Sequence, residues 1–518
     1  MERERTSPTS LPIGKAGAAT IAALGSVIFS RGGGAVRFNN RLLRGVVLTA
    51  LLATASPALT RSSNGGWAAK AREDIIASHN IIRDNHPGPV DALNPRFKDW
   101  LEKGRSQALA KATFARTESD YWQALTFYIN GFRDGHLTAR RNGSVNQVWP
   151  GFLTSTDASG TTRVTVSTVA AAPIGARIIE CDGIPVRRLL DKRVHPYLTN
   201  AGIPHERLLT ASYLFVEDAD DRAKMRACFI DVDTSRTKTT TLDWQPIDKG
   251  KLAQMLPEAQ GRVEPPLAVR QIDGLWFISL PSFNWWGDQA AKMQAMVAEV
   301  KRQAATLHAA PRVVIDVRGN PGGNSQWARE IASALWNEAA VSAIVDSFDQ
   351  TVDWRASTQN AQLTRASAAR SASAGLIDDA QSRNHVADQM EAAIAMGQPL
   401  FTDAEPPTSP GLPANYASPF KGKVFFLTDM RCASACLDFA DIVTRMPGVV
   451  HVGQPTSADT IYIDNVEVPL PSGAARLSYS LKVYRHRLRG SNQWYSPKVS
   501  WGGGRMTDAA VARWITTL

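Results

Sequence analysis

The stretch KVFFLTDMRCASACLDFADIV, residues 423–443, decides the fold of the second half of this 518-residue chain. It begins with an apolar run, passes through a turn of small residues and continues as an amphipathic segment, which predicts a buried strand, a turn and a helix. The turn presents Ser434 as a candidate nucleophile, and the amide of Ala435 at the helix N-terminus is a candidate donor to an oxyanion. A serine at such a turn is also a common helix N-cap, and this alternative stays open.

A second strand–turn–helix pattern precedes the first one in the chain. The apolar run 312–317 predicts a buried strand, and the motif DVRGNPGGN at 316–324 opens the next helix. The adjacent glycines Gly322 and Gly323 let backbone amides approach a ligand, because no Cβ stands in the way. A phosphate-binding P-loop is excluded, since no Lys-Ser/Thr follows the glycines. The motif favours an oxyanion hole, with a simple tight turn as the alternative.

Together these motifs resemble the carboxyl-terminal processing (tail-specific) serine peptidases, and within them the tricorn-core branch. The resemblance spans roughly residues 70–518 and is carried by segments in the family's order, namely 274–283, 316–323, 423–438 and 452–456, with 173–186 similar to the family's PDZ-like module. It implies Ser434 as the nucleophile, with oxyanion donors from Ala435 and from the Gly322–Gly323 pair. It also implies an α/β catalytic domain with a mostly parallel, crotonase/ClpP-like sheet, an N-terminal helical cap and a β-rich PDZ-like module.

The motifs described so far do not supply a general base. The tail-specific branch uses a lysine downstream of the serine, but the matching region 453–459 contains no lysine, so a Ser-Lys dyad is excluded. The segment 131–137 resembles the one that carries the histidine base in the tricorn-like branch, which implies His136 as the base. An imidazole with a pKa of about 6.5 suits proton transfer near neutrality. The alternative is a histidine that caps the carbonyl end of a helix.

A third catalytic residue should hold the base in one tautomer. We expect Asp459 in this role, because it lies where the other branch places its lysine. Asp438 is the rival, although the family expects its acid one position earlier, where this chain has Leu437. Asp134 is expected to stabilise its own turn.

The pattern changes character at several points, which predicts four regions. Residues 1–55 are an N-terminal extension with a signal peptide, 66–145 a helical cap, 146–265 the PDZ-like module and 266–518 the α/β catalytic domain. An Ala/Ser-rich stretch at 365–420 interrupts the last region and is interpreted as an insertion or lid.

Charge and composition narrow the function classes. The formal net charge is +10, but residues 1–55 hold seven Lys/Arg and two acids, which leaves a mild excess spread over the rest of the chain. No basic stripe interleaved with aromatic residues is present, so nucleic-acid binding is not expected. The CxxxC pair has no further ligands at metal-binding spacing, so neither a metal nor another cofactor is expected. No segment after the N-terminal region reaches transmembrane length.

The N-terminal region predicts export. A basic segment at 41–44, a short apolar core at 45–52 and the small-x-small pattern Ala53-Thr54-Ala55 form a signal peptide that ends near Ala55. Its distance from Met1 favours a true start near Val36, and an uncleaved anchor is the alternative. The predicted location is therefore periplasmic or secreted.

Four cysteines fit an oxidising compartment and allow three disulfide connectivities. We expect Cys432 and Cys436 to form a disulfide that braces the turn around Ser434, with two buried free thiols as the alternative. The sequence thus predicts an exported serine endopeptidase that cleaves unstructured or C-terminal protein segments through an acyl-enzyme on Ser434. The alternative is an inactive protein of the same fold that binds peptides or apolar ligands.

Overall fold

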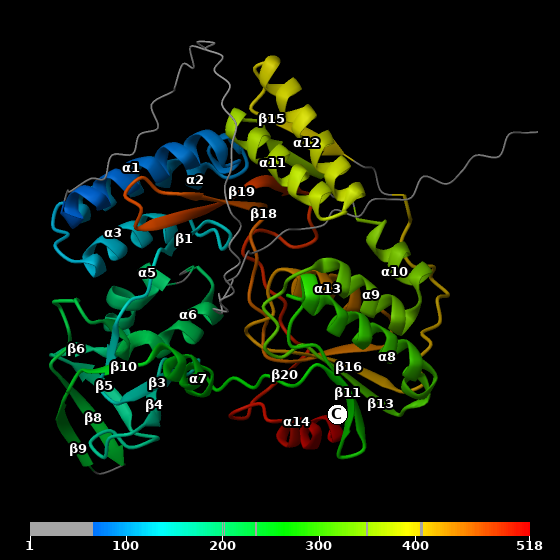
Figure 1. The fold of residues 1–518 in the computed structure, drawn as a ribbon. Helices are drawn as coiled ribbons and strands as arrows, with labels where there is room; N and C mark the ends of the chain where they lie inside the picture. Colours follow the sequence, from blue (N-terminus) through cyan, green and yellow to red (C-terminus); the bar gives the residue numbers. More distant parts are fainter. Residues whose placement is uncertain (1–65, 199, 201, 234–235, 349–350, 405–407) are drawn as a thin grey trace, which may run out of the picture.

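A parallel sheet forms the centre of one half of the molecule (Figure 1). The computed structural model describes residues 66–518 except 199, 201, 234–235, 349–350 and 405–407, so the predicted signal peptide lies outside the described residues. The strands follow the order β11 (Ala268–Ile272), β12 (Leu275–Ser279), β13 (Arg312–Asp316), β16 (Lys423–Thr428), β17 (Val449–Gly453) and β20 (Val499–Ser500). Only the β11–β12 pair is antiparallel within this described sheet. The mostly parallel α/β sheet predicted from the sequence is confirmed.

Helices cover both faces of this sheet, which explains why its strands are apolar runs rather than alternating patterns. One face packs against α8 (Ala290–Ala309), α9 (Ser325–Trp336) and α13 (Ala435–Val443), and the other against α14 (Asp508–Thr516). Successive residues of β13 point into different clusters: Val313 into the first and Val314 into the second. Both strand–turn–helix units predicted from the sequence are therefore built into one core.

A second sheet forms the upper part of the other half. Its strands are β1 (Thr138–Arg141), β19 (Ala475–Arg485), β14 (Thr351–Arg355) and β15 (Leu400–Ala404), with β18 (Tyr462–Pro469) also paired to β19. The helices α1 (Trp67–Asn85), α2 (Pro95–Ala112) and α3 (Glu118–Asn130) pack on it and share one hydrophobic cluster with residues of β18 and β19. The amphipathic helices of the predicted cap therefore bury their apolar faces on strands from the C-terminal part of the chain.

The region 146–265 is β-rich, as expected for the PDZ-like module. Its main sheet contains β3 (Phe152–Thr156), β4 (Thr162–Ser167), β5 (Arg177–Cys181), β8 (Ala227–Asp233) and β9 (Arg236–Thr241), with β6 (Ile184–Pro185) paired to β5. A smaller sheet holds β10 (Gln245–Ile247), β2 (Gln147–Trp149) and β7 (Glu217–Asp218). The helices are α4 (Val186–Leu189), α5 (His195–Leu198), α6 (Pro204–Thr210) and α7 (Lys249–Ala259). Asp182 and Gly183 form the predicted hairpin turn, both with positive φ.

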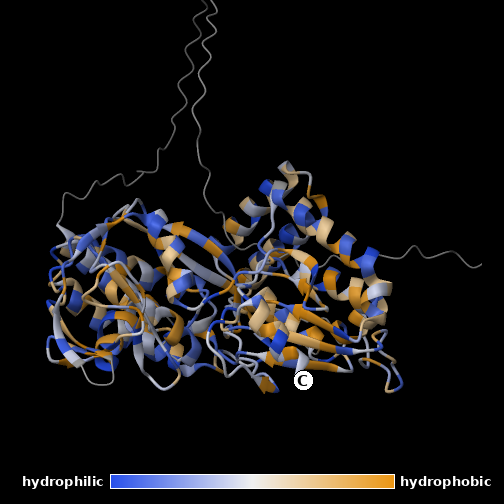
Figure 2. Cartoon of the chain, turned by 90° about the horizontal axis from the view of Figure 1, so that it is seen from below, coloured by the Kyte–Doolittle hydropathy of each residue, from blue (hydrophilic) through white to orange (hydrophobic). Residues whose placement is uncertain are grey.

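The segment predicted as an insertion is largely a helical hairpin. The predicted bounds 365–420 begin inside α11 (Thr358–Ser373), which comes after α10 (Glu338–Val345) and β14, and they include α12 (Ile377–Ala395) and the strand β15 of the second sheet. Ala361, Val386 and Met390 form a small cluster of their own, against which Trp354 of β14 and Phe401 of β15 pack. Apolar residues concentrate on the strands and on the inner helix faces (Figure 2). In the described part of the chain, no helix combines the length and apolar character needed to cross a membrane.

Candidate active site

The turn between β16 and α13 holds Ser434 in a strained conformation. Its φ is 53° and its ψ is −125°, in a region that residues with a Cβ rarely adopt. Ser434 occupies the N-cap position, but its side chain makes no capping hydrogen bond. The N-cap alternative therefore does not explain this serine. A strained, half-buried residue with an unengaged hydroxyl is instead typical of a functional site.

The Gly322–Gly323 pair packs directly against this turn. A Cβ on Gly322, which has a φ of 97°, would lie 2.6 Å from the carbonyl oxygen of Ala433 and 2.7 Å from Cβ of Ser434. A Cβ on Gly323 would lie 2.2 Å from the carbonyl carbon of Phe283. Only glycine fits at either position, so the two motifs singled out from the sequence form one site.

Two backbone amides at this junction are free to donate. Within the described part of the chain, the N–H groups of Ala435 and Gly323 have no hydrogen-bond partner. The N–H of Gly322, by contrast, already donates to Oδ1 of Asn320 at 2.8 Å. Of the two glycines considered as oxyanion donors, Gly323 therefore has the available amide, while Gly322 shapes the turn. Ala435 also lies at the N-terminus of α13, where the helix dipole favours negative charge.

His136 lies between α3 and β1, and its ring is held from one side. Nδ1 lies 2.8 Å from the backbone carbonyl oxygen of Tyr462, so this nitrogen must carry the hydrogen and donate it. Neutral imidazole then presents Nε2 as a proton acceptor. The carbonyl belongs to a strand far away in sequence and not to the end of α3, which contradicts the helix-capping alternative.

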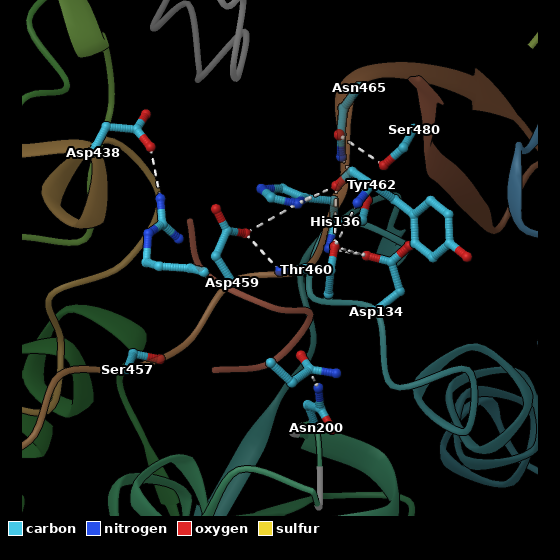
Figure 3. Close-up of polar contacts among 12 residues, drawn as sticks. Asp134, His136, Asn200, Asp438, Ser457, Asp459, Thr460, Tyr462, Asn465 and Ser480 are labelled. Atoms are coloured by element: carbon cyan, nitrogen blue, oxygen red, sulfur yellow. Dashed lines mark hydrogen bonds and ion pairs between the residues drawn. The ribbon is translucent and has the colours of Figure 1, made fainter. Parts of the chain in front are cut away.

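Asp459 lies beside His136, as Figure 3 shows. Its Oδ1 is 3.4 Å from Nδ1 of His136, and its side chain is 5% exposed. The carbonyl oxygen of Tyr462 lies closer to Nδ1 than the carboxylate of Asp459 does. The hydrogen on Nδ1 is therefore donated to the carbonyl, and the carboxylate lies further away. The rival Asp438 does not contact His136 but binds Ser325 and Arg487.

Asp134 supports the backbone of His136. Its Oδ1 accepts the backbone N–H of His136 at 2.9 Å and the hydroxyl of Thr460 at 2.9 Å, while Oδ2 accepts from Nε2 of His86 at 3.1 Å. Burial alone raises the pKa of Asp134, but the hydrogen bond and charge of His86 outweigh burial and hold the pKa below its usual value. The sequence indicated a turn-stabilising role for Asp134 but gave no sign of His86, which stands in a segment with the appearance of a helix break.

Ser434 and His136 do not share a hydrogen bond in the part of the chain that is described. A chain of ion pairs does connect their surroundings. Arg487 lies 3.5 Å from Asp459 and donates at 2.8 Å to Asp438, which stands in the first turn of α13. Burial lowers the pKa of Arg487, but Asp438 and Asp459 outweigh it and raise the pKa above its usual value. Arg487 therefore stays charged and links the loop of Asp459 to the helix α13, which follows Ser434.

A disulfide between Cys432 and Cys436 brackets Ser434, which is the pairing expected from the sequence. Both cysteines are fully buried, and α13 begins between them at Ala435. The second disulfide joins Cys181 and Cys228, which are direct partners on the adjacent strands β5 and β8. No cysteine of the chain is left free.

Part of the chain matches the model of a known protein family. Residues 275–491 match the model of peptidase family S41. The matched stretch covers less than half of the chain, and over this stretch the chain is similar to peptidase family S41. The members of this family are serine-type peptidases. The matched S41 stretch contains the Gly322–Gly323 pair, Ser434 and Asp459, whereas His136 lies outside it, in the N-terminal part of the chain.

Two solved structures of CPAF share the fold of this chain at low sequence identity. Mature CPAF has a TM-score of 0.55 at 14% identity, over 84% of this chain and 93% of the CPAF chain. Mature CPAF complexed with lactacystin gives a TM-score of 0.55 at 16% identity, over 84% and 94%. The tricorn protease gives a TM-score of 0.35 at 12% identity, over 87% of this chain and 37% of the tricorn chain. Curated protein sequences gave no match.

Proposed function

We propose that this chain is an active serine endopeptidase, with Ser434 as the nucleophile and His136 as the general base. The observation that carries the proposal is the strained turn at Ser434, whose hydroxyl is unengaged and which lies against the Gly322–Gly323 turn. Free amides at Ala435 and Gly323 supply the donors that acyl transfer requires. The match of residues 275–491 to the model of peptidase family S41 supports the same reaction class.

The proposed reaction passes through an acyl-enzyme. Oγ of Ser434 attacks the peptide carbonyl carbon and transfers its proton to Nε2 of His136, while the amides of Ala435 and Gly323 bind the carbonyl oxygen as it becomes negative. The C–N bond then breaks, and the imidazolium returns the proton to the leaving amine. Water, activated by the same histidine, hydrolyses the ester and regenerates Ser434.

The surroundings of His136 suit this proton transfer. The carbonyl of Tyr462 holds the hydrogen on Nδ1, so Nε2 is the nitrogen available to the serine. Asp459 adds a negative charge 3.4 Å from Nδ1, which stabilises the imidazolium that forms during the reaction. Hydrogen bonds between a nucleophile and its base are often long without substrate, and we propose that the bond between Ser434 and His136 forms when a peptide is bound.

A fluorophosphonate probe tests this assignment directly, because it reacts only with an activated serine. We expect labelling of the folded protein at Ser434, none in Ser434→Ala and at least a 100-fold lower rate in His136→Gln. His385→Gln is the matched control, since His385 is exposed on α12. Equal cleavage of an unstructured protein by the parent and by Ser434→Ala would show that the assignment is wrong. Folded parent that is never labelled would identify the protein as the inactive binding alternative.

We further propose that the protein works outside the cytoplasm, on unstructured segments of other proteins. Its four cysteines are all paired in two disulfides, and disulfides persist in oxidising compartments. The predicted signal peptide supports the same location. Mass spectrometry of the protein recovered from the periplasm or medium should find an N-terminus near Ser56. Recovery of the intact Met1 form from the cytoplasm alone would contradict export.

A further inference from the structure

A cavity of about 380 Å³ lies behind the loop that carries the base. Its walls come from α2, from the turn at 131–134 and from the chain at 461–462 and 491–492. Neither His136 nor Ser434 lines it, so it is separate from the reactive atoms. Its volume falls in the range of pockets that hold small organic ligands.

The walls of this cavity combine apolar surface with positive charge. The apolar part is formed by Phe97, Trp100, Phe132 and Ile461. Three cationic side chains also line the cavity, namely Arg96, Lys103 and Arg133, and none of them forms an ion pair with a described residue. The acids in the lining are Asp99 and Asp134, and the latter is already bonded to His86, to Thr460 and to the amide of His136. Apart from Asp134, the lining therefore carries three cations against the one carboxylate of Asp99, and this positive excess favours a ligand with an apolar body and a negative head.

Two of the lining residues hold the base directly. Asp134 accepts the backbone N–H of His136, and the carbonyl of Tyr462 accepts the hydrogen on Nδ1. A molecule in the cavity thus touches Asp134 and Tyr462, which set the position and tautomer of the imidazole; Figure 3 shows both residues beside His136. Only one layer of residues separates the cavity from the base.

We propose that this cavity is an accessory site for a small aliphatic carboxylate, and that its occupancy changes the reactivity of Ser434 through His136. The carboxylate pairs with the cations of α2 and of the 131–134 turn, and the alkyl chain lies on the aromatic wall. Because the cavity is bounded by several separate segments, a compact ligand fits it better than an extended peptide. Binding itself does not depend on the proposed peptidase activity, whereas the effect on Ser434 does.

Calorimetric titration of the full chain with octanoate tests the binding. We expect one site, with octanol bound at least about tenfold more weakly because it lacks the charge. Lys103→Gln should weaken octanoate binding about fivefold, since it removes one charged donor. Lys98→Gln is the matched control: it makes the same change on an exposed lysine of the same helix that does not line the cavity. No binding, equal binding of octanol, or equal loss in both variants would overturn the site.

The rate of fluorophosphonate labelling tests the connection to the base. Saturating octanoate should change the labelling rate of Ser434 at least twofold in the parent and in Lys98→Gln. At an octanoate concentration near the dissociation constant of the parent, the effect should be smaller in Lys103→Gln than in the parent. Binding with an unchanged labelling rate would disprove the connection. A protein that binds octanoate but is never labelled would contradict the proposed peptidase function and leave the carboxylate site supported.

Discussion

Replacing Gly322 with alanine should disable the site while leaving most of the fold intact. The added Cβ would lie 2.6 Å from the carbonyl oxygen of Ala433, 2.7 Å from Cβ of Ser434 and 2.9 Å from the nitrogen of Ala435. All three atoms belong to the nucleophile turn and none is the end of a flexible side chain, so the turn itself must shift. The φ of 97° at this position adds a cost of about 1 kcal/mol for any residue with a Cβ.

The expected magnitude follows from this displacement. Movement of a catalytic group by about 1 Å can lower a rate about 100-fold. A 100-fold loss corresponds to about 2.7 kcal/mol of transition-state stabilisation, which is comparable to the loss of one oxyanion donor. We therefore expect the second-order rate of fluorophosphonate labelling of Ser434 to fall about 100-fold in Gly322→Ala.

Gly143→Ala separates the clash from the backbone strain. Gly143 has a φ of 93°, almost the same as Gly322, but a Cβ there would meet no atom within 4 Å. This control should lose a similar 1 kcal/mol or so of stability and keep a labelling rate within about twofold of the parent. Labelling rates and thermal unfolding are measured for both variants and for the parent. A parental labelling rate in Gly322→Ala would refute the geometric argument, as would equal losses in the two variants.

Three other predictions concern the base, the core and the disulfide. Because the carbonyl of Tyr462 already holds Nδ1, Asp459→Asn should slow labelling only about tenfold, and a loss near the 10⁴-fold found for triads with an indispensable aspartate would contradict this order of contacts. Burial lowers the pKa of His451 to about 4, so the unfolded chain binds a proton that the folded one does not. The free energy of unfolding should therefore fall by about 3 kcal/mol as the pH drops from about 6.5 to 4, and denaturant titrations of His451→Gln should lack this part of the fall. Replacing both cysteines of the Cys432–Cys436 pair by alanine should slow labelling about tenfold, whereas the same change in the Cys181–Cys228 pair should leave the rate unchanged.

The central sheet and the nucleophile turn could be predicted from the sequence because their signals are local. Consecutive apolar residues in 312–317 and 423–428 identify buried strands, and the small residues after each strand identify the turns. The adjacent glycines Gly322 and Gly323, which close backbone approach requires, can likewise be recognised in the sequence. The sequence does not show which of the two glycine amides remains free. The side chain of Asn320 decides this, because it accepts the N–H of Gly322 in a contact that the spacing of residues does not predict.

The partner of the base could not be predicted for a physical reason. Nδ1 of His136 donates to a backbone carbonyl, and every residue type has one, so the identity of Tyr462 carries no signal. The same limit applies to the pairing of β1 with β19, where Thr138 lies opposite Ser478. Strand pairing over this sequence separation depends on tertiary packing and not on a local pattern. The position of Asp459 beside His136 could be predicted only from the family resemblance, because Asp459 lies in the region where the tail-specific branch has its lysine.

The proposed nucleophile Ser434 and the proposed base His136 belong to two different cores, and the chain crosses between these cores near the site. One crossing, between β17 and β18, carries Asp459, and another, after β19, carries Arg487. His136 contacts Tyr462 in the cap sheet and Asp459 in the segment between β17 and β18. These two contacts therefore stay fixed if the two cores move relative to each other. The distance from His136 to Ser434, by contrast, depends on that movement. The orientation of His136 is therefore set within one core. The proposed activation of Ser434 by His136 depends instead on the distance between the two cores.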